Sequence, residues 1–129
     1  MKTIMHFGKN IFILFALLLS GVTSACHKAG PGGNSSVSGT VKHHSLPIPN
    51  CIVYIKYGAT EFPGTDVSIY DNHVTADANA HYEFTSLYKG NYFLYGVGFD
   101  NTIMQTVTGG IGIKLKKNEK ATSDVPVTE

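Results

Sequence analysis

The sequence predicts an all-β fold in which antiparallel sheets pack face to face. From Val37 onward, apolar residues alternate with polar ones, which is the period of a half-buried strand rather than of a helix. Clusters of Pro, Gly, Asn and Asp separate these runs at short intervals and predict turns. Short strands between frequent turns are typical of a β-sandwich, and residues 37–129 are numerous enough for one hydrophobic core.

Six strands can be placed in order along this region. They are expected at residues 37–41, 51–57, 82–84, 92–99, 111–115 and 125–127. The turn signals are Pro and Asn at 46–50 and Asp and Asn at 77–79. The Gly109-Gly110 pair is not followed by a helical pattern, and we interpret it as another turn.

The first 25 residues have the layout of an export signal. Lys2 and Lys9 flank a stretch without acids, the apolar run 11–19 follows, and small residues fill 20–25. The apolar run is about half as long as a membrane-spanning helix requires. We therefore expect residues 1–25 to be a cleaved signal peptide.

The end of this signal resembles the lipobox of bacterial lipoproteins, in which a cysteine is acylated and becomes the mature N-terminus. The residues are Thr23, Ser24, Ala25 and Cys26; Thr23 departs from the pattern, where Leu, Val or Ile is usual. The resemblance implies a lipid anchor, including palmitate, on Cys26. Cleavage after Ala25 without acylation is the alternative, but it would leave a reactive thiol in an oxidising compartment.

Residues 26–36 are expected to be the lipidated cysteine and a flexible tether, because the segment is rich in Gly, Ser and Pro. No acidic cluster follows Cys26. In the Bacteroidetes-type lipoproteins that the chain resembles, such clusters often mark export to the cell surface. We therefore expect an outer-membrane protein that faces the periplasm, with surface exposure as the alternative.

Three motifs within residues 37–129 resemble carboxypeptidase-regulatory-like domains, which are also described as transthyretin-like or prealbumin-type. Residues 38–55 resemble the opening Gly-x-Val strand, Pro-containing turn and second strand. Residues 74–84 resemble the Thr-Asp-x-x-Gly-x-Tyr-x-Phe hairpin, with Ala80 in the usual Gly place, and 87–94 resemble Leu-x-x-Gly-x-Tyr-x-Leu. The resemblance implies a seven-stranded antiparallel Greek-key sandwich without a catalytic motif.

The resemblance also implies which side chains point inward. The expected core contains Cys51, Tyr82, Phe84, Tyr92 and Leu94, so Cys51 is interpreted as a small buried hydrophobic residue rather than a nucleophile. Residues of the opposite parity face away from the core. Among these, the candidate binding face is formed by Tyr54, Phe93, Tyr95 and Phe99.

The connection 58–73 offers an alternative to an open binding face. It contains Phe62, Ile69 and Tyr70 and is too apolar for a solvated loop. Packing it across Tyr54, Phe93 or Tyr95 would remove both apolar surfaces from water. We therefore predict that it covers the outward face.

No pattern predicts a metal or cofactor. His43 and His44 are adjacent, so a continuing strand would point them to opposite faces and prevent them from sharing one ion. His73 and His81 flank a turn, and Asp and Asn at 71–72 and 77–79 offer oxygens, but neither group has the further ligands of a zinc, copper or calcium site. Catalytic motifs such as Gly-x-Ser-x-Gly and His-Glu-x-x-His are absent from the sequence.

Composition limits the partners. The ten basic residues are all Lys, the acids number nine, and the formal net charge is +1, so electrostatic binding of nucleic acid has little support. We expect a non-catalytic envelope lipoprotein that has no cofactor and binds or scaffolds an envelope protein. The alternative is a lipoprotein that binds carbohydrate or another small ligand through exposed aromatic rings.

Overall fold

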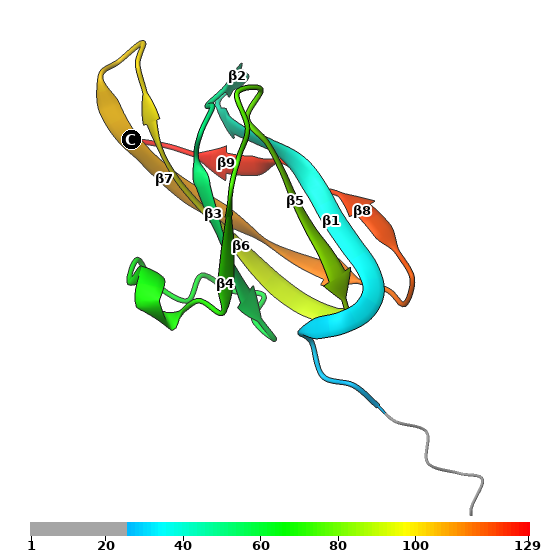
Figure 1. The fold of residues 1–129 in the computed structure, drawn as a ribbon. Coiled ribbons are helices and arrows are strands. Elements are labelled where there is room, and N and C mark those ends of the chain that lie inside the picture. Colours follow the sequence, from blue (N-terminus) through cyan, green and yellow to red (C-terminus); the bar gives the residue numbers. More distant parts are fainter. Residues whose placement is uncertain (1–25) are drawn as a thin grey trace, which may run out of the picture.

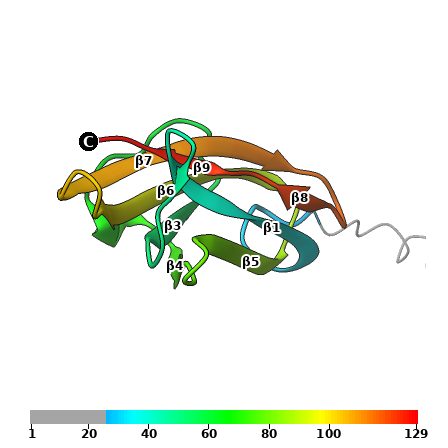
Figure 2. The ribbon, with the colours of Figure 1, turned by 90° about the horizontal axis from the view of Figure 1, so that it is seen from above.

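Two β-sheets packed face to face form the fold (Figures 1 and 2). This computed structural model describes residues 26–129, so the predicted signal peptide, residues 1–25, lies outside the described residues. The first sheet contains β1 (Pro31–His43), β2 (Leu46–Pro47), β5 (His81–Leu87), β8 (Lys120–Thr122) and β9 (Val125–Val127). The second has the order β4 (Asn72–Thr75), β3 (Ile52–Tyr57), β6 (Gly90–Asp100) and β7 (Gln105–Leu115).

The predicted all-β sandwich is confirmed, with differences in detail. Residues 26–129 contain three short strands, β2, β4 and β8, that the sequence pattern did not indicate. The last two strands, β8 and β9, run parallel to β1, whereas the other pairings are antiparallel. A 3₁₀ helix, η2 (Val67–Ile69), lies in the connection between β3 and β4.

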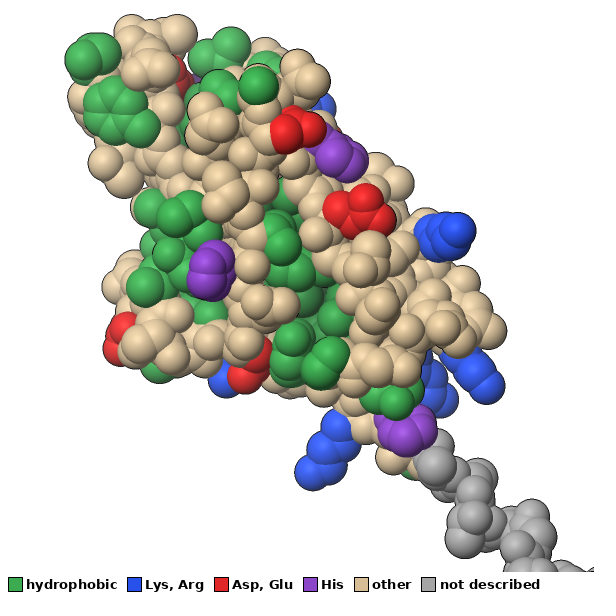
Figure 3. Space-filling view, in the orientation of Figure 1, with side chains coloured by type: hydrophobic (Ala, Val, Ile, Leu, Met, Phe, Trp, Pro, Cys, Tyr) green, Lys and Arg blue, Asp and Glu red, His purple; other side chains and the backbone are tan. Residues whose placement is uncertain are grey.

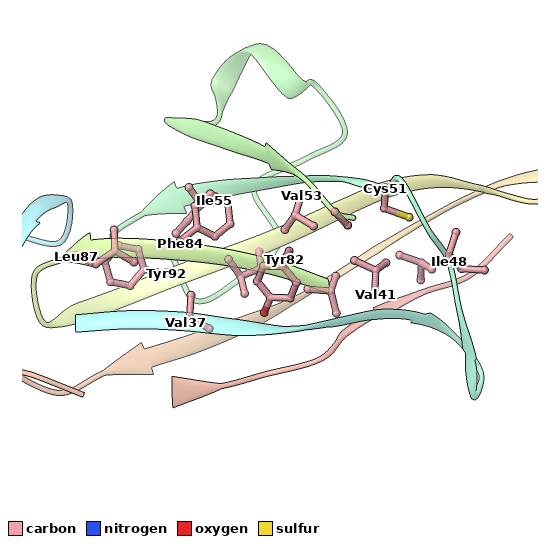
Figure 4. Close-up of a cluster of buried hydrophobic side chains, with 14 of the residues drawn as sticks. Val37, Val41, Ile48, Cys51, Val53, Ile55, Tyr82, Phe84, Leu87 and Tyr92 are labelled. Atoms are coloured by element: carbon pink, nitrogen blue, oxygen red, sulfur yellow. The ribbon is translucent and has the colours of Figure 1, made fainter. Parts of the chain in front are cut away.

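The core lies between the two sheets, and Figure 4 shows its side chains pointing toward one another from β1, β3, β5 and β6. All five residues predicted for it, Cys51, Tyr82, Phe84, Tyr92 and Leu94, are buried there. Buried residues alternate with more exposed neighbours along β3 and β5, whereas on β6 the intervening Phe93 and Tyr95 are buried as well. Each large apolar side chain contributes about 1.5–3 kcal/mol by leaving water. The inward parity is therefore confirmed.

The predicted flexible tether is partly wrong, because β1 begins at Pro31 and pairs with β5. The amide of Gly30 donates to the Tyr92 hydroxyl oxygen at 2.8 Å, and the amide of Tyr88 donates to the Gly30 carbonyl at 2.8 Å. A side chain at Gly33 would clash with the carbonyl of Leu87, so glycine allows this close pairing. The Gly-rich composition therefore serves strand pairing as well as chain flexibility.

The Gly109-Gly110 pair is not a turn, because it lies inside β7 opposite Gly96 and Tyr95 of β6. A side chain at Gly110 would clash with the carbonyl of Leu94 and the ring of Phe93. Gly110 therefore makes room for Phe93 of β6, whereas a side chain at Gly109 would clash with the carbonyl of Pro126 in β9. Among the described residues, no helix is long and apolar enough to cross a membrane.

Candidate functional site

The predicted binding face is mostly closed. The strands β3 and β6 bring Tyr54 opposite Tyr95, with Phe93 on the same face of β6. The side chains of Phe93 and Tyr95 are only 6% and 3% exposed, and Tyr54 is half-buried. Phe99 lies further along β6 and is 44% exposed. The structure therefore groups three of the four predicted residues but leaves only Phe99 open to solvent.

The connection between β3 and β4 covers this face, as predicted. The ring of Phe62 lies 5.8 Å from that of Phe93 and 5.4 Å from that of Tyr95, measured between centroids. Tyr70 stacks on Tyr95 with a centroid distance of 5.5 Å and an interplanar angle of 16°. Offset aromatic pairs of this kind add about 0.5–1.5 kcal/mol each to the gain from burial. The prediction of a cover is thus confirmed.

Polar contacts hold the cover in place. The Tyr70 hydroxyl donates to the Gly64 carbonyl at 2.8 Å, and the Lys56 ammonium donates to the Ile69 carbonyl at 2.9 Å. The Asp71 carboxylate accepts the amide of Tyr57 at 2.7 Å. Burial, with a smaller contribution from Tyr95, raises the pKa of Tyr70 to about 12. The end of the connection that precedes β4 is therefore fixed to β3, and Phe93 and Tyr95 under the connection are buried.

An open pocket lies elsewhere, at the end of the sandwich where the β1–β2 turn, the β6–β7 hairpin and the end of β9 meet. Its volume is about 300 Å³, and it is lined by His43, His44, Ser45, Leu46, Asp100, Thr102, Ile103 and Glu129. Two apolar residues of the lining, Leu46 and Ile103, are exposed, and so are Phe99 and Met104 of the β6–β7 hairpin, with Met104 at 71%. We call this region the distal tip.

A buried charged pair forms the floor of the pocket. Nδ1 of His43 lies 2.7 Å from Oδ2 of Asp100, and both side chains are buried. The amide and hydroxyl of Thr102 donate to Oδ1 of the same carboxylate at 2.8 and 2.6 Å. The bonds from Thr102 and then His43 lower the pKa of Asp100 to about 2, and the hydrogen bond to Asp100 raises the pKa of His43. Because Asp100 is ionised, Nδ1 of His43 is the donor.

The expectation that His43 and His44 point to opposite faces is wrong. β1 ends at His43, and His44 adopts a left-handed backbone with φ 56°, so the chain turns and brings both imidazoles to one side. Their ring centroids lie 4.5 Å apart. Oε2 of Glu129 lies 2.6 Å from Nε2 of His43, and donor atoms of His43, His44 and Glu129 lie within 4.8 Å of one another.

The other candidate ligands are not brought together. Among residues 26–129, neither His73 nor His81 joins a group that could hold a metal, and the His73 ring packs against Tyr54. The Asp77 carboxylate accepts the backbone amides of Asn79 and His81 at 2.8 and 3.0 Å, and these bonds lower its pKa. Asp77 therefore stabilises the turn between β4 and β5, as Asp in turns commonly does.

The two cysteines have different environments. Cys26 is exposed, and its acylation stays a prediction. Cys51 is buried, and burial raises the pKa of its thiol to about 11. A thiol with such a pKa is neutral at physiological pH and is a poor nucleophile.

The end of the domain at which Cys26 lies is strongly basic. Six of the eight lysines in residues 26–129 are exposed around it: Lys28, Lys89, Lys114, Lys116, Lys117 and Lys120. Glu119 is the acid that accompanies them, and none of the six forms an ion pair within the described chain. Figure 3 shows Lys side chains around this lower end, and apolar side chains both at the opposite upper end and across the middle of the visible face.

Comparisons with known proteins support the fold. No family model matches the chain, and a comparison with curated proteins finds no match. Among solved structures, the sandwich is similar to the crystal structure of "a putative carbohydrate binding protein" from Pseudomonas aeruginosa, with 12% sequence identity and a TM-score of 0.51. The match covers 79% of this chain and 92% of that one, so the chain shares the β-sandwich fold with this protein.

Proposed function

We propose that this protein is a non-catalytic, lipid-anchored β-sandwich module of the cell envelope that presents its distal tip to a protein partner. The single observation that carries the proposal is the polarity of the molecule. Within residues 26–129, lysines that form no ion pair lie around the end that carries Cys26, whereas exposed Leu46, Ile103 and Met104 and an open pocket lie at the other end. A lipid on Cys26 would place the basic end against anionic headgroups and point the distal tip away from the membrane.

The chemistry of the distal tip favours a protein over a sugar. Leu46, Ile103 and Met104 are flexible or branched aliphatic side chains that project from two hairpins, and Met is common at binding surfaces because it adapts its shape. Apolar residues next to a buried charged pair resemble the mixed character of protein interfaces. Carbohydrate binding usually uses open aromatic faces, but Phe93 and Tyr95 are covered by Phe62 and Tyr70.

Binding of a carbohydrate is the second candidate function, and the structural neighbour is the observation that favours it. That protein is described as a putative carbohydrate-binding protein. Phe99 is an exposed aromatic residue that directly precedes the pocket residue Asp100 in β6, and it would be the stacking residue in this case. Binding of envelope polysaccharides to the intact protein, abolished by Phe99→Ala but unaffected by Met104→Asp, would favour this second function.

Two measurements test the proposal. Cys26→Ser removes the acylation site and should move the protein from the membrane fraction to the soluble envelope fraction. If this variant stays in membranes after a high-salt wash, the lipid anchor is wrong. A photo-crosslinking residue in place of Met104 should trap a specific envelope protein in cells, and the same residue at Glu83, which is exposed on the side of β5, is the matched control.

The crosslink should depend on the apolar side chains of the distal tip. Ile103→Asp should remove the crosslink and leave the fold intact, because Ile103 is exposed and is not part of the core. An equal yield from positions 104 and 83, or a crosslink that survives Ile103→Asp, would contradict a partner at the distal tip.

A further inference from the structure

We propose that His43, His44 and Glu129 form a binding site for a divalent transition metal of the Zn²⁺ type at the floor of the distal pocket. The site goes beyond the proposed function, since a partner could bind the apolar tip whether or not a metal is held below it. Two imidazoles and one carboxylate are a donor set that zinc uses in proteins. The donor atoms of these three residues already lie within 4.8 Å of one another.

The surroundings of His43 are those of a metal-bound histidine. Its Nδ1 is held by the carboxylate of Asp100 at 2.7 Å, and Thr102 fixes that carboxylate through two further hydrogen bonds. Histidines that bind metals almost always place the second ring nitrogen on such a carboxylate, which fixes the tautomer and orients the ring. In the neutral imidazole this leaves the lone pair on Nε2, the ring nitrogen that faces away from Asp100.

Nε2 of His43 is buried and has no hydrogen-bond partner among the described residues. Oε2 of Glu129 lies only 2.6 Å from Nε2, but the angle between the two groups is not that of a hydrogen bond. Two ligand atoms of a tetrahedral zinc, each about 2 Å from the metal, lie about 3.3 Å apart, so Glu129 would have to move slightly outward to bind a metal together with His43. Its exposed side chain leaves room for that movement. An unpartnered buried nitrogen is otherwise costly, and a metal ion would satisfy it.

The charge and the shape of the pocket fit a dication. Glu129 and Asp100 supply two carboxylates, and neutral imidazoles supply the other donors, so a divalent ion would balance the local charge. With three protein donors the fourth tetrahedral position would face the open pocket of about 300 Å³. A water molecule or a side chain of a bound partner could occupy that position.

Retention of zinc by the full-length protein tests the site. The protein is purified in detergent through an affinity tag that contains no histidine, loaded with ZnCl₂, dialysed at pH 7.5 and analysed for zinc per chain. We expect one zinc in the wild type and a melting temperature that rises with added zinc. His44→Asn and Glu129→Gln each remove one ligand and should weaken zinc binding at least about tenfold.

The two ligand variants, His44→Asn and Glu129→Gln, should fold like the wild type. His44 and Glu129 are exposed, and Asn tolerates the left-handed backbone of position 44. His81→Asn, an exposed histidine outside the pocket, is the matched control and should bind zinc like the wild type. Absence of zinc from the wild type, or equal retention by the wild type and both ligand variants, would overturn the proposal.

Discussion

The ring of Tyr70 stacks on the ring of Tyr95 at a centroid distance of 5.5 Å, and this contact joins the β3–β4 connection to the outward face of the second sheet. Tyr70→Ala should therefore loosen the connection and destabilise the domain by about 1–2 kcal/mol. Hydrogen exchange should become fast along residues 58–71, while β6 stays protected. Phe99→Ala removes an aromatic residue from the same strand face without touching the cover, and exchange in that variant should match the wild type.

A glycine lets the cover lie close to β7. A side chain at Gly112 would clash with the carbonyl oxygen of Thr60, which is backbone and cannot rotate away. Gly112→Ala should therefore displace the start of the cover and cost about 1–3 kcal/mol, as overpacking usually does. Lys114→Ala, two residues further on the same strand face, is the control. Equal urea midpoints for the two variants would show that the close approach of Thr60 does not matter.

The core provides the sharpest test of strand parity. Phe84 is buried and packs edge-on against Tyr82 with a centroid distance of 6.2 Å, whereas Phe99 is 44% exposed. Phe84→Ala should cost about 3–5 kcal/mol, which is a large fraction of the stability of a small domain. The matched change Phe99→Ala should cost about 1 kcal/mol or less. Urea denaturation distinguishes the two, and similar losses would contradict the parity.

The thiol of Cys51 should report on folding through its pH dependence. Burial raises its pKa from 9.0 to about 11, so the folded protein favours the neutral thiol. The corresponding contribution to stability is fully present below pH 9 and is lost as the pH rises from about 9 to 11. At pH 8 we expect Cys51 to react with a thiol reagent only after denaturation, and Cys51→Ala to flatten the loss of stability above pH 9. Fast reaction in the native state would contradict the burial.

Alternation predicted the strands and the sandwich from sequence because it depends only on the period of a strand. The resemblance to carboxypeptidase-regulatory-like domains implied which side chains point inward, and Phe84 is buried as it implied. The apolar character of the connection indicated the cover over Phe93. Ala80 adopts a left-handed backbone with φ 62° at the position where the resembled motif has Gly. The hairpin therefore keeps its backbone geometry even with a residue that disfavours it.

The distal pocket could not be predicted in the same way. His43 and Asp100 come from different strands, and Glu129 comes from the end of the chain, so their meeting depends on tertiary structure. Strand alternation predicted the wrong direction for the side chain of His44. The reason is that β1 ends at His43 and the left-handed backbone of His44 turns the chain. The signal that was available is the turn itself, since Pro and Ser at 45–49 indicate a break directly after the two histidines.

The lysines around Cys26 should bind anionic membranes even without a lipid. A Cys26→Ser protein should bind vesicles that contain anionic lipid, should release them at high salt, and should bind neutral vesicles weakly. Each lysine near the surface contributes about 1 kcal/mol, so Lys116→Gln combined with Lys117→Gln should weaken binding about tenfold or more. Asn101→Asp with Thr106→Glu changes the net charge equally at the distal tip, where both residues are exposed, and is the control. If that control weakens binding as much as the lysine pair does, net charge rather than the basic end governs the interaction, and the proposed orientation on the membrane is wrong.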